Sequence, residues 1–254
     1  MSLKIGEIKQ VLSSTEITRL PEEIAKFKDD DRSGVKKLIE GFEKKLDNYY
    51  AELRRIEELS AFENKLKSEG YKLIAGIDEV GRGPFAGPVV TAVVILDDKT
   101  QILGINDSKK LSAAKREELN EIILSKAICC SFGIVSPKII DEINILQATY
   151  IAMQKAIEDM ITKPDFILAD AVTIPKISIP QKGIIHGDAR SISIGAASII
   201  AKVKRDAMMD EYDKAFPEYG FSRNKGYGSA EHITALKEFG PTAIHRRSFI
   251  KNFV

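Results

Sequence analysis

The sequence predicts an α/β fold with a central mixed sheet, preceded by a helical N-terminal extension. Short apolar runs rich in β-branched residues, typical of buried strands, alternate with segments whose apolar residues recur every three or four positions, as in helices. The first strands follow one another closely and the later ones alternate with helices, an order that favours a mixed sheet. No strand-like run occurs in residues 1–70.

The N-terminal extension, residues 1–70, contains 14 Lys/Arg and 15 Asp/Glu. Pro21, followed by Glu22 and Glu23, is typical of a first helical turn. From Gly34 to Leu59 apolar residues recur with a helical period. We therefore expect two or three helices that end near Gly70.

Residues 71–254 are expected to form one larger domain, with a helical C-terminal part from about 217 to 254. The apolar patterns predict strands over 73–77, 89–96, 127–135 and 165–169, helices over 112–126, 137–161, 195–216 and 230–239, and strand and loop over 171–194.

Composition excludes several protein classes. The chain has 254 residues, 44% hydrophobic and 30% charged, with a formal charge of +1. This composition is that of a globular protein, and any affinity for nucleic acid must come from local patches. Cys129 and Cys130 are adjacent, which excludes a disulfide framework and a cysteine zinc site. No apolar run reaches the ~18 residues of a membrane span, and no secretory signal is evident. We expect a cytoplasmic protein without a membrane partner.

Four acidic residues follow strand-like runs or precede an apolar helix. Asp78 and Glu79 come after 73–77, Asp170 follows 166–168, and Asp188 lies just before a small-residue helix. Carboxylates at strand ends of an open α/β sheet converge on one crevice, although a strand end that meets water would explain the first pair alone. Such oxygen ligands suit Mg²⁺ or Mn²⁺, and two ions ~3.5–4 Å apart could clamp a phosphodiester.

Two glycine-containing segments are candidate substrate contacts. Gly81-Arg82-Gly83 matches neither a P-loop nor a dinucleotide fingerprint, and alone it could be a tight turn; beside paired acids, its backbone could approach a sugar or phosphate. Lys225-Gly226-Tyr227-Gly228 presents an aromatic ring within a region, 221–254, that has six Lys/Arg and two Asp/Glu. The ring could stack on a nucleotide, or it could be a tyrosine of the core.

These segments occur in one order together with others. The set comprises 75–84, 86–89, Asp107-Ser108-Lys109-Lys110-Leu111, Gly187-Asp188, 196–203 with Arg205-Asp206, and Lys225-Gly226-Tyr227-Gly228. It resembles bacterial ribonuclease HII over roughly 72–250. The resemblance implies a ribonuclease H-like fold, and a metal site of Asp78, Glu79, Asp170 and Asp188. It also implies that the backbone of Gly81, Arg82 and Gly83 recognises a ribose 2′-hydroxyl, and that Tyr227 stacks on the next deoxyribose.

The resemblance further implies an activity. The expected enzyme is a metal-dependent endoribonuclease that uses two Mn²⁺ or Mg²⁺ ions to cleave the RNA of RNA/DNA hybrids. It also incises 5′ of ribonucleotides embedded in duplex DNA, in replication and repair, and leaves 3′-hydroxyl and 5′-phosphate ends. Protein partners are not indicated.

Two alternatives remain at this point. Ribonuclease HIII usually carries Gly-Lys-Gly at the turn and a β-rich N-terminal platform, and both features differ from this chain. A hybrid-binding module without activity would not need all four acids.

The other candidate residues are less specific. Lys109 and Lys225 could bind phosphate, and Ser191 could donate to substrate or to a ligand carboxylate. Asp206 is expected to be structural, and His186 to shape its loop. His232 and His245 are expected at the surface or in contact with nucleic acid.

Overall fold

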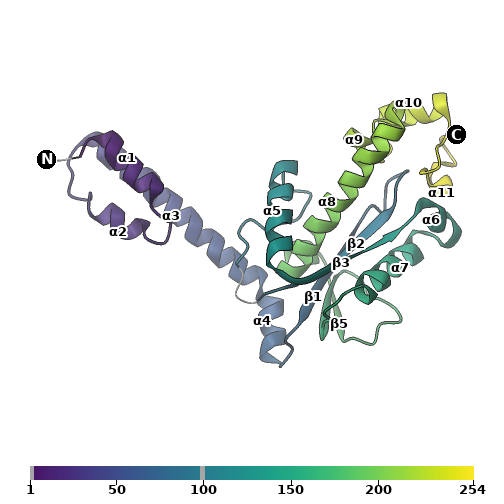
Figure 1. Ribbon diagram of the computed structural model, residues 1–254, viewed down its shortest axis with the longest axis horizontal. Coiled ribbons are helices and arrows are strands. Elements are labelled where there is room, and N and C mark those ends of the chain that lie inside the picture. The colour runs from purple at the N-terminus through teal and green to yellow at the C-terminus, as the bar shows by residue number, and fades with distance from the viewer. Residues whose placement is uncertain (1–2, 98–100) are drawn as a thin grey trace. The chain divides into compact units, whose positions relative to one another are not determined.

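The computed structural model describes residues 3–97 and 101–254 (Figure 1). The chain divides into two compact units, one ending at Glu57 and the other beginning at Glu58. Each unit has a hydrophobic core of its own.

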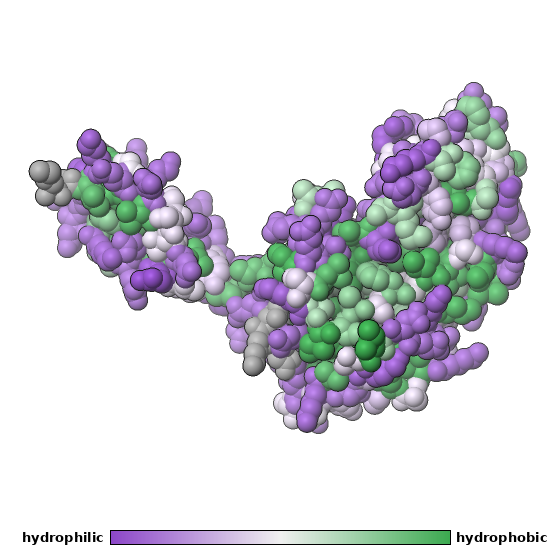
Figure 2. Space-filling view, in the orientation of Figure 1, coloured by the Kyte–Doolittle hydropathy of each residue, from purple (hydrophilic) through white to green (hydrophobic). Residues whose placement is uncertain are grey.

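The N-terminal unit is helical, as predicted. It contains α1 (Ile5–Ser14), α2 (Leu20–Ala25) and most of α3 (Ser33–Leu59). The apolar residues of the three helices bury one another around Leu12, Leu20 and Val35, and the surface of this unit in Figure 2 is mostly hydrophilic. Before Gly70 the described chain has four helices rather than two or three, because α3 ends at Leu59 and α4 (Ala61–Ser68) begins after Ser60.

The second unit is built on a five-stranded sheet of order β3-β2-β1-β4-β5. The strands are β1 (Ile74–Val80), β2 (Val89–Leu96), β3 (Ala127–Val135), β4 (Phe166–Asp170) and β5 (Gln181–Ile184). The pairs β1–β2 and β2–β3 are antiparallel, whereas β1–β4 and β4–β5 are parallel. The predicted mixed sheet is confirmed.

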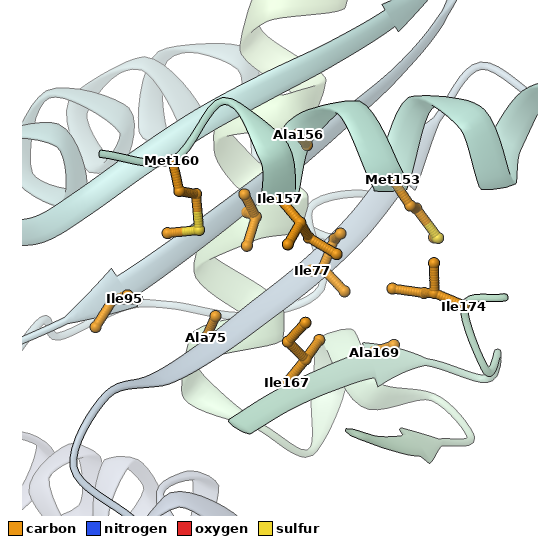
Figure 3. Close-up of a cluster of buried hydrophobic side chains, with 11 residues drawn as sticks. Ala75, Ile77, Ile95, Met153, Ala156, Ile157, Met160, Ile167, Ala169 and Ile174 are labelled. Carbon is orange, nitrogen blue, oxygen red and sulfur yellow. The ribbon is translucent and has the colours of Figure 1, made fainter. Parts of the chain in front are cut away.

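Helices cover both faces of the sheet. On one face, Met153 and Ile157 of α7 (Ile145–Glu158) pack on Ile77 and Ile167 (Figure 3). On the other, α8 (Ile192–Ala215) lies so close to β1 that a Cβ on Gly76 would be 2.0 Å from the Ser193 carbonyl carbon. Because side chains alternate along a strand, Asp78 shares the α8 face with Gly76.

Several element boundaries differ from the predictions. Asp78 and Glu79 lie within β1 rather than after it, because β1 continues to pair with β2 up to Val80. The predicted helix 137–161 is divided into α6 (Pro137–Ile143) and α7 by Asn144, which has a φ of 69° and caps α7 through its side chain. Helix α8 begins at Ile192, since the Ser191 hydroxyl caps it by accepting from the Ile194 N–H.

The remaining elements form the flanks of the sheet and the C-terminal part. Helix α5 (Ala113–Lys126) is capped by Ser112, and the short helix η1 (Gly187–Ala189) precedes α8. The C-terminal helices are η2 (Pro217–Tyr219), α9 (Phe221–Asn224), α10 (Ala230–Phe239) and α11 (Arg247–Ile250). They share a core with the C-terminal half of α8. Within the described parts of the chain, no helix is both long and apolar enough to cross a membrane.

Candidate active site

A cavity of about 350 Å³ opens between β1, the end of β4, and α8. Three of the predicted acids, Asp78, Glu79 and Asp170, line it. The cations Lys109, Arg116 and Lys202, the ring of Tyr227 and the hydroxyls of Ser108 and Ser198 complete its wall. The cavity therefore combines carboxylates, cations and an aromatic ring.

Asp78 and Glu79 are adjacent in β1, yet both reach this cavity. Asp78 is buried, and its Oδ1 accepts a hydrogen bond from the Glu79 N–H at 2.8 Å. Glu79 Oε1 accepts from Arg82 Nη1 at 3.3 Å, whereas Glu79 Oε2 is buried without a hydrogen-bond partner in the described structure. Of the two carboxylates that the strand presents, that of Glu79 is thus incompletely satisfied by its described surroundings.

The pKa values of these two acids reflect that environment. Burial, followed by the charge of Glu79, raises the pKa of Asp78 well above its ordinary value. Burial also raises the pKa of Glu79; Arg82 opposes the increase, and Asp170 adds to it. Negative charge is therefore costly here in the absence of a cation.

Asp170 and Asp188 lie next to each other at the other side of the site. Asp170 ends β4, and its Oδ1 accepts from the Gly187 N–H at 2.7 Å, so that η1 lies against the strand end. Asp188, in η1, is buried, and its Oδ2 lies 3.8 Å from Lys109 Nζ. Burial and the nearby charges of Asp107 and Asp170 raise the pKa of Asp188.

The four acids fit a site for divalent cations in chemistry and charge. All are hard oxygen donors, and Glu79 Oε2 has no hydrogen-bond partner among the described residues. Burial and neighbouring carboxylates raise the pKa values of Asp78, Glu79 and Asp188. As the side chains lie, no three His, Cys, Asp or Glu groups among the described residues converge as a set of metal ligands. The side chains are therefore neighbours that would have to close around a bound ion.

The cations at the cavity differ in their exposure and in the carboxylates with which they pair. The Lys109 side chain is 80% exposed, and although burial lowers its pKa, Asp188 and other carboxylates raise it. Lys202 Nζ donates to Asp206 Oδ1 at 2.6 Å, and Arg116 Nη2 lies 3.8 Å from Asp206 Oδ2. Asp206 thus orients cations at the wall, as its structural interpretation predicts, and Lys109 is the most exposed of the three cations.

The Gly81–Gly83 turn and Tyr227 come together in the structure. A Cβ on Gly83 would lie 3.6 Å from Tyr227 Cε1, and the Phe85 N–H donates to the Gly226 carbonyl at 2.8 Å. The Tyr227 ring is 49% exposed, so it is not the core tyrosine that the alternative interpretation required. It is available to a ligand that enters the cavity.

Four residues have surroundings that the sequence did not indicate. Ser191 is fully buried and donates to Glu63 Oε1 at 2.5 Å, so its hydroxyl serves the start of α8. Lys225 forms an ion pair with Asp210. The expectation that His232 and His245 lie at the surface was wrong: both are buried, and their Nε2 atoms are 2.9 Å apart.

Sequence reasoning missed the buried groups that support the site. Arg205 and Arg246 are 0% exposed and hold the loop that follows β1. Glu63 of α4 accepts from the Ser193 N–H at 3.0 Å and so caps α8, the helix that carries Ser198. A charged residue inside an apolar stretch would indicate a buried charge. Arg205 and Glu63 do not show this pattern, because other charged residues surround both in the sequence.

Comparison with known proteins agrees with these motifs. Residues 75–252 match the family model of ribonuclease HII, and residues 4–67 match that of the ribonuclease HII N-terminal domain. Ribonuclease HII of Lachnoclostridium phytofermentans is 53% identical over 99% of this chain and 98% of its own length. The corresponding protein of Clostridioides difficile is 50% identical over 98% of each.

Solved structures show the same fold. Ribonuclease H2 from Pyrococcus horikoshii superposes with a TM-score of 0.61 at 29% identity, covering 72% of this chain and 97% of that one. A ribonuclease HIII structure described as a complex with Mn²⁺ gives a TM-score of 0.53 at 18% identity, over 67% of this chain and 64% of that one, and so shows the fold alone. With both family models matched along the chain and relatives similar over its full length, this protein belongs to the ribonuclease HII family and is a ribonuclease H, a metal-dependent hydrolase.

Proposed function

We propose that the enzyme cleaves the RNA strand of RNA/DNA hybrids and incises duplex DNA on the 5′ side of an embedded ribonucleotide, leaving 3′-hydroxyl and 5′-phosphate ends. The observation that carries this proposal is the cavity, in which buried carboxylates of raised pKa lie beside Lys109 and Tyr227. A phosphodiester flanked by a sugar matches this combination of groups.

Asp78, Glu79, Asp170 and Asp188 are the proposed ligands of two divalent ions, Mn²⁺ or Mg²⁺. When bound, such ions supply a water of lowered pKa and positive charge beside the departing 3′-oxygen. The carboxylates provide the charge that holds them, and this role is supported by Glu79 Oε2, which has no hydrogen-bond partner in the described part of the chain. The Mn²⁺ complex described for a ribonuclease HIII is consistent with it.

Substrate contacts are proposed for the rest of the cavity wall. The exposed Lys109 ammonium would pair with a phosphate. The backbone of Gly81–Gly83 would contact a ribose 2′-hydroxyl, and the neighbouring Tyr227 ring would stack on the sugar of the following deoxynucleotide. The turn would require the 2′-hydroxyl, and the ring beside it would favour a sugar that lacks one. Together they would recognise a junction between a ribonucleotide and a deoxyribonucleotide.

The decisive experiment uses a DNA duplex with one embedded ribonucleotide, incubated with Mn²⁺ or Mg²⁺. The wild-type enzyme should cut it once, 5′ of the ribonucleotide, and Asp78→Asn should not. Binding without cutting by the wild type would instead indicate a hybrid-binding module. Cutting only of duplexes with a run of four ribonucleotides would indicate specificity of the ribonuclease HIII kind.

A further inference from the structure

Two arginines are fully buried in the second unit, and neither forms an ion pair with a described carboxylate. Arg205 lies on α8, and Arg246 immediately precedes α11; both are 0% exposed. A buried charge is expensive unless its hydrogen bonds are satisfied. The hydrogen-bond partners of these two guanidinium groups therefore indicate the role of the buried side chains.

Among the described residues, the Arg246 side chain donates only to backbone carbonyls of the loop that follows β1. Its Nη2 reaches Gly81 O at 2.5 Å and Gly87 O at 2.8 Å, its Nη1 reaches Arg82 O at 2.9 Å, and its Nε reaches Gly87 O at 3.0 Å. The guanidinium also lies over the ring of Phe249, 5.2 Å from its centroid. One side chain thus holds both ends of the loop 81–87.

Arg205 connects the same loop to the segment that carries Tyr227. Its Nε donates to Pro88 O at 3.0 Å and its Nη2 to Ala86 O at 3.1 Å. Its Nη1 donates to Lys225 O at 2.9 Å, two residues before Tyr227. Arg205 therefore joins the two loops directly.

The space around these bonds is closely filled. A Cβ on Gly81 would be 2.2 Å from Arg205 Nε, and a Cβ on Gly226 would be 2.5 Å from Ala86 O. The loop carbonyls of Gly81 and Arg82 face the buried guanidinium of Arg246, while the N–H groups of Arg82 and Gly83 have no hydrogen-bond partner within the described structure. The protein therefore binds the turn through its carbonyl groups, and the N–H groups of the turn can donate to a ligand.

We propose that Arg205 and Arg246 are positioning residues that fix the spacing between the Gly81–Gly83 turn and the Tyr227 ring, and thereby set the selectivity for a junction between a ribonucleotide and a deoxyribonucleotide. This inference rests on the proposed function. Arginine suits the task better than lysine because its planar fork offers five donors in fixed directions, which diverging carbonyls require.

The test compares Arg246→Lys and Arg205→Lys with the wild type on two substrates of the same sequence. One is a DNA duplex with a single ribonucleotide, and the other is a continuous RNA/DNA hybrid. Both variants keep the positive charge but lose the fork. The ratio of kcat/KM for the single ribonucleotide to kcat/KM for the hybrid should fall by about tenfold or more, since misplacement of a group by about 1 Å can cost ~100-fold.

A matched control is Arg32→Lys in the N-terminal unit, whose guanidinium also donates to a backbone carbonyl, that of Leu3, at 2.9 Å. This variant should leave the ratio unchanged. Adding Tyr227→Ala supplies a double-mutant cycle: if the arginines act through the position of Tyr227, Arg246→Lys should change the ratio little in that background.

An unchanged ratio, or an equal loss of activity on both substrates, would overturn the positioning role, because a purely structural role lowers both rates together. If one lysine variant does not fold, the other decides, since each must lower the ratio. Failure of the wild type to cut at a single ribonucleotide would contradict the proposed function itself. A wild type that cuts there, with variants of unchanged ratio, would contradict the positioning role alone.

Discussion

In and beside the acidic cavity, Asp78 and Asp188 are buried and Glu79 is partly buried, each near other carboxylates, and Glu79 Oε2 has no partner in the described structure. Beneath the adjoining loop, Arg205 and Arg246 are buried just as deeply, but their donors end on carbonyls at 2.5 to 3.1 Å. The first region lacks hydrogen-bonding and charge partners that a ligand can supply. The second is complete in the protein alone, and so can hold a fixed shape.

This difference indicates how to tell a binding group from a supporting one. A buried charge whose neighbours are of the same sign gains most when a counter-ion arrives. A buried charge whose hydrogen bonds are all made gains nothing from a ligand, and its removal leaves its partners unsatisfied. Substitutions of the acids should therefore lower activity without lowering stability, whereas substitutions of the buried arginines should lower stability.

The largest effect is expected in the acidic cavity. Asp78→Asn should lower the cleavage rate on the order of 10³-fold, the scale on which loss of a charge-stabilising group acts. The metal-free variant should be as stable as the wild type or more so, because a repelled, buried charge is removed. Rates with Mn²⁺ and thermal unfolding in chelator test both parts. A large loss of stability in chelator would contradict the contrast between the two regions.

The next effect concerns stability. Arg205→Met removes the donors to Pro88, Ala86 and Lys225, and each buried carbonyl left without a partner costs about 1–3 kcal/mol. We expect a loss of about 3 kcal/mol or more in the free energy of unfolding, measured with urea in chelator. Arg190→Met, at an exposed arginine, is the control. If both variants unfold at the same urea concentration, the carbonyls do not depend on Arg205.

Most of the sheet and the candidate ligands were readable from the sequence because their signals are local. β-Branched runs predicted β2 and β3 with their observed bounds, and acids beside apolar runs stand out at Asp78 and Asp170. The boundary of β1 was missed because Asp78 and Glu79 resemble a strand end, whereas pairing with β2 continues through both.

The supporting groups were not readable, because their partners are distant and carry no side-chain signal. Arg205 binds the carbonyl of Pro88, 117 positions away, and Arg246 binds that of Gly81, 165 positions away. A carbonyl is present at every residue, so no sequence pattern marks it as an acceptor. His232 and His245 were misassigned because what buries them also lies elsewhere in the chain: the rings of Tyr219 and Phe221 lie against both, and that of Phe85 lies against His232.

A smaller effect should come from the hydroxyl beside Asp78. Burial and the charge of Glu79 raise the pKa of Asp78, and a hydrogen bond with the Ser198 hydroxyl opposes this increase. Ser198 Oγ is 3.0 Å from Ser108 Oγ. Ser198→Ala should weaken Mn²⁺ binding by about 10–100-fold, the range for partners that orient a ligand. Calorimetric titration of Mn²⁺ measures this, with Ser125→Ala, at an exposed position on α5, as the control. Unchanged Mn²⁺ affinity would show that Ser198 does not orient Asp78.

The smallest effect separates the satisfied region from the acidic one by pH. His245 Nδ1 accepts from the Thr242 N–H at 2.9 Å, so its Nε2 carries the proton and donates to His232, whose Nδ1 then donates to the Tyr227 carbonyl. This chain of bonds requires both rings to be neutral. Burial, with His232 and Arg247 nearby, lowers the pKa of His245 from 6.5 to about 4.

Because the folded state binds this proton less readily than the unfolded state, the stability is complete above pH 6.5 and declines as the pH falls toward 4. The slope for one such proton approaches about 1.4 kcal/mol per pH unit. His245→Gln should therefore lose less stability than the wild type between about pH 6.5 and 5, measured by urea unfolding in chelator. The acidic cavity titrates alike in both proteins, so the difference between them isolates the imidazole. Parallel curves would mean that His245 takes up its proton as readily in the folded protein as in the unfolded chain, and that the neutral chain of bonds to Tyr227 is not what holds that loop.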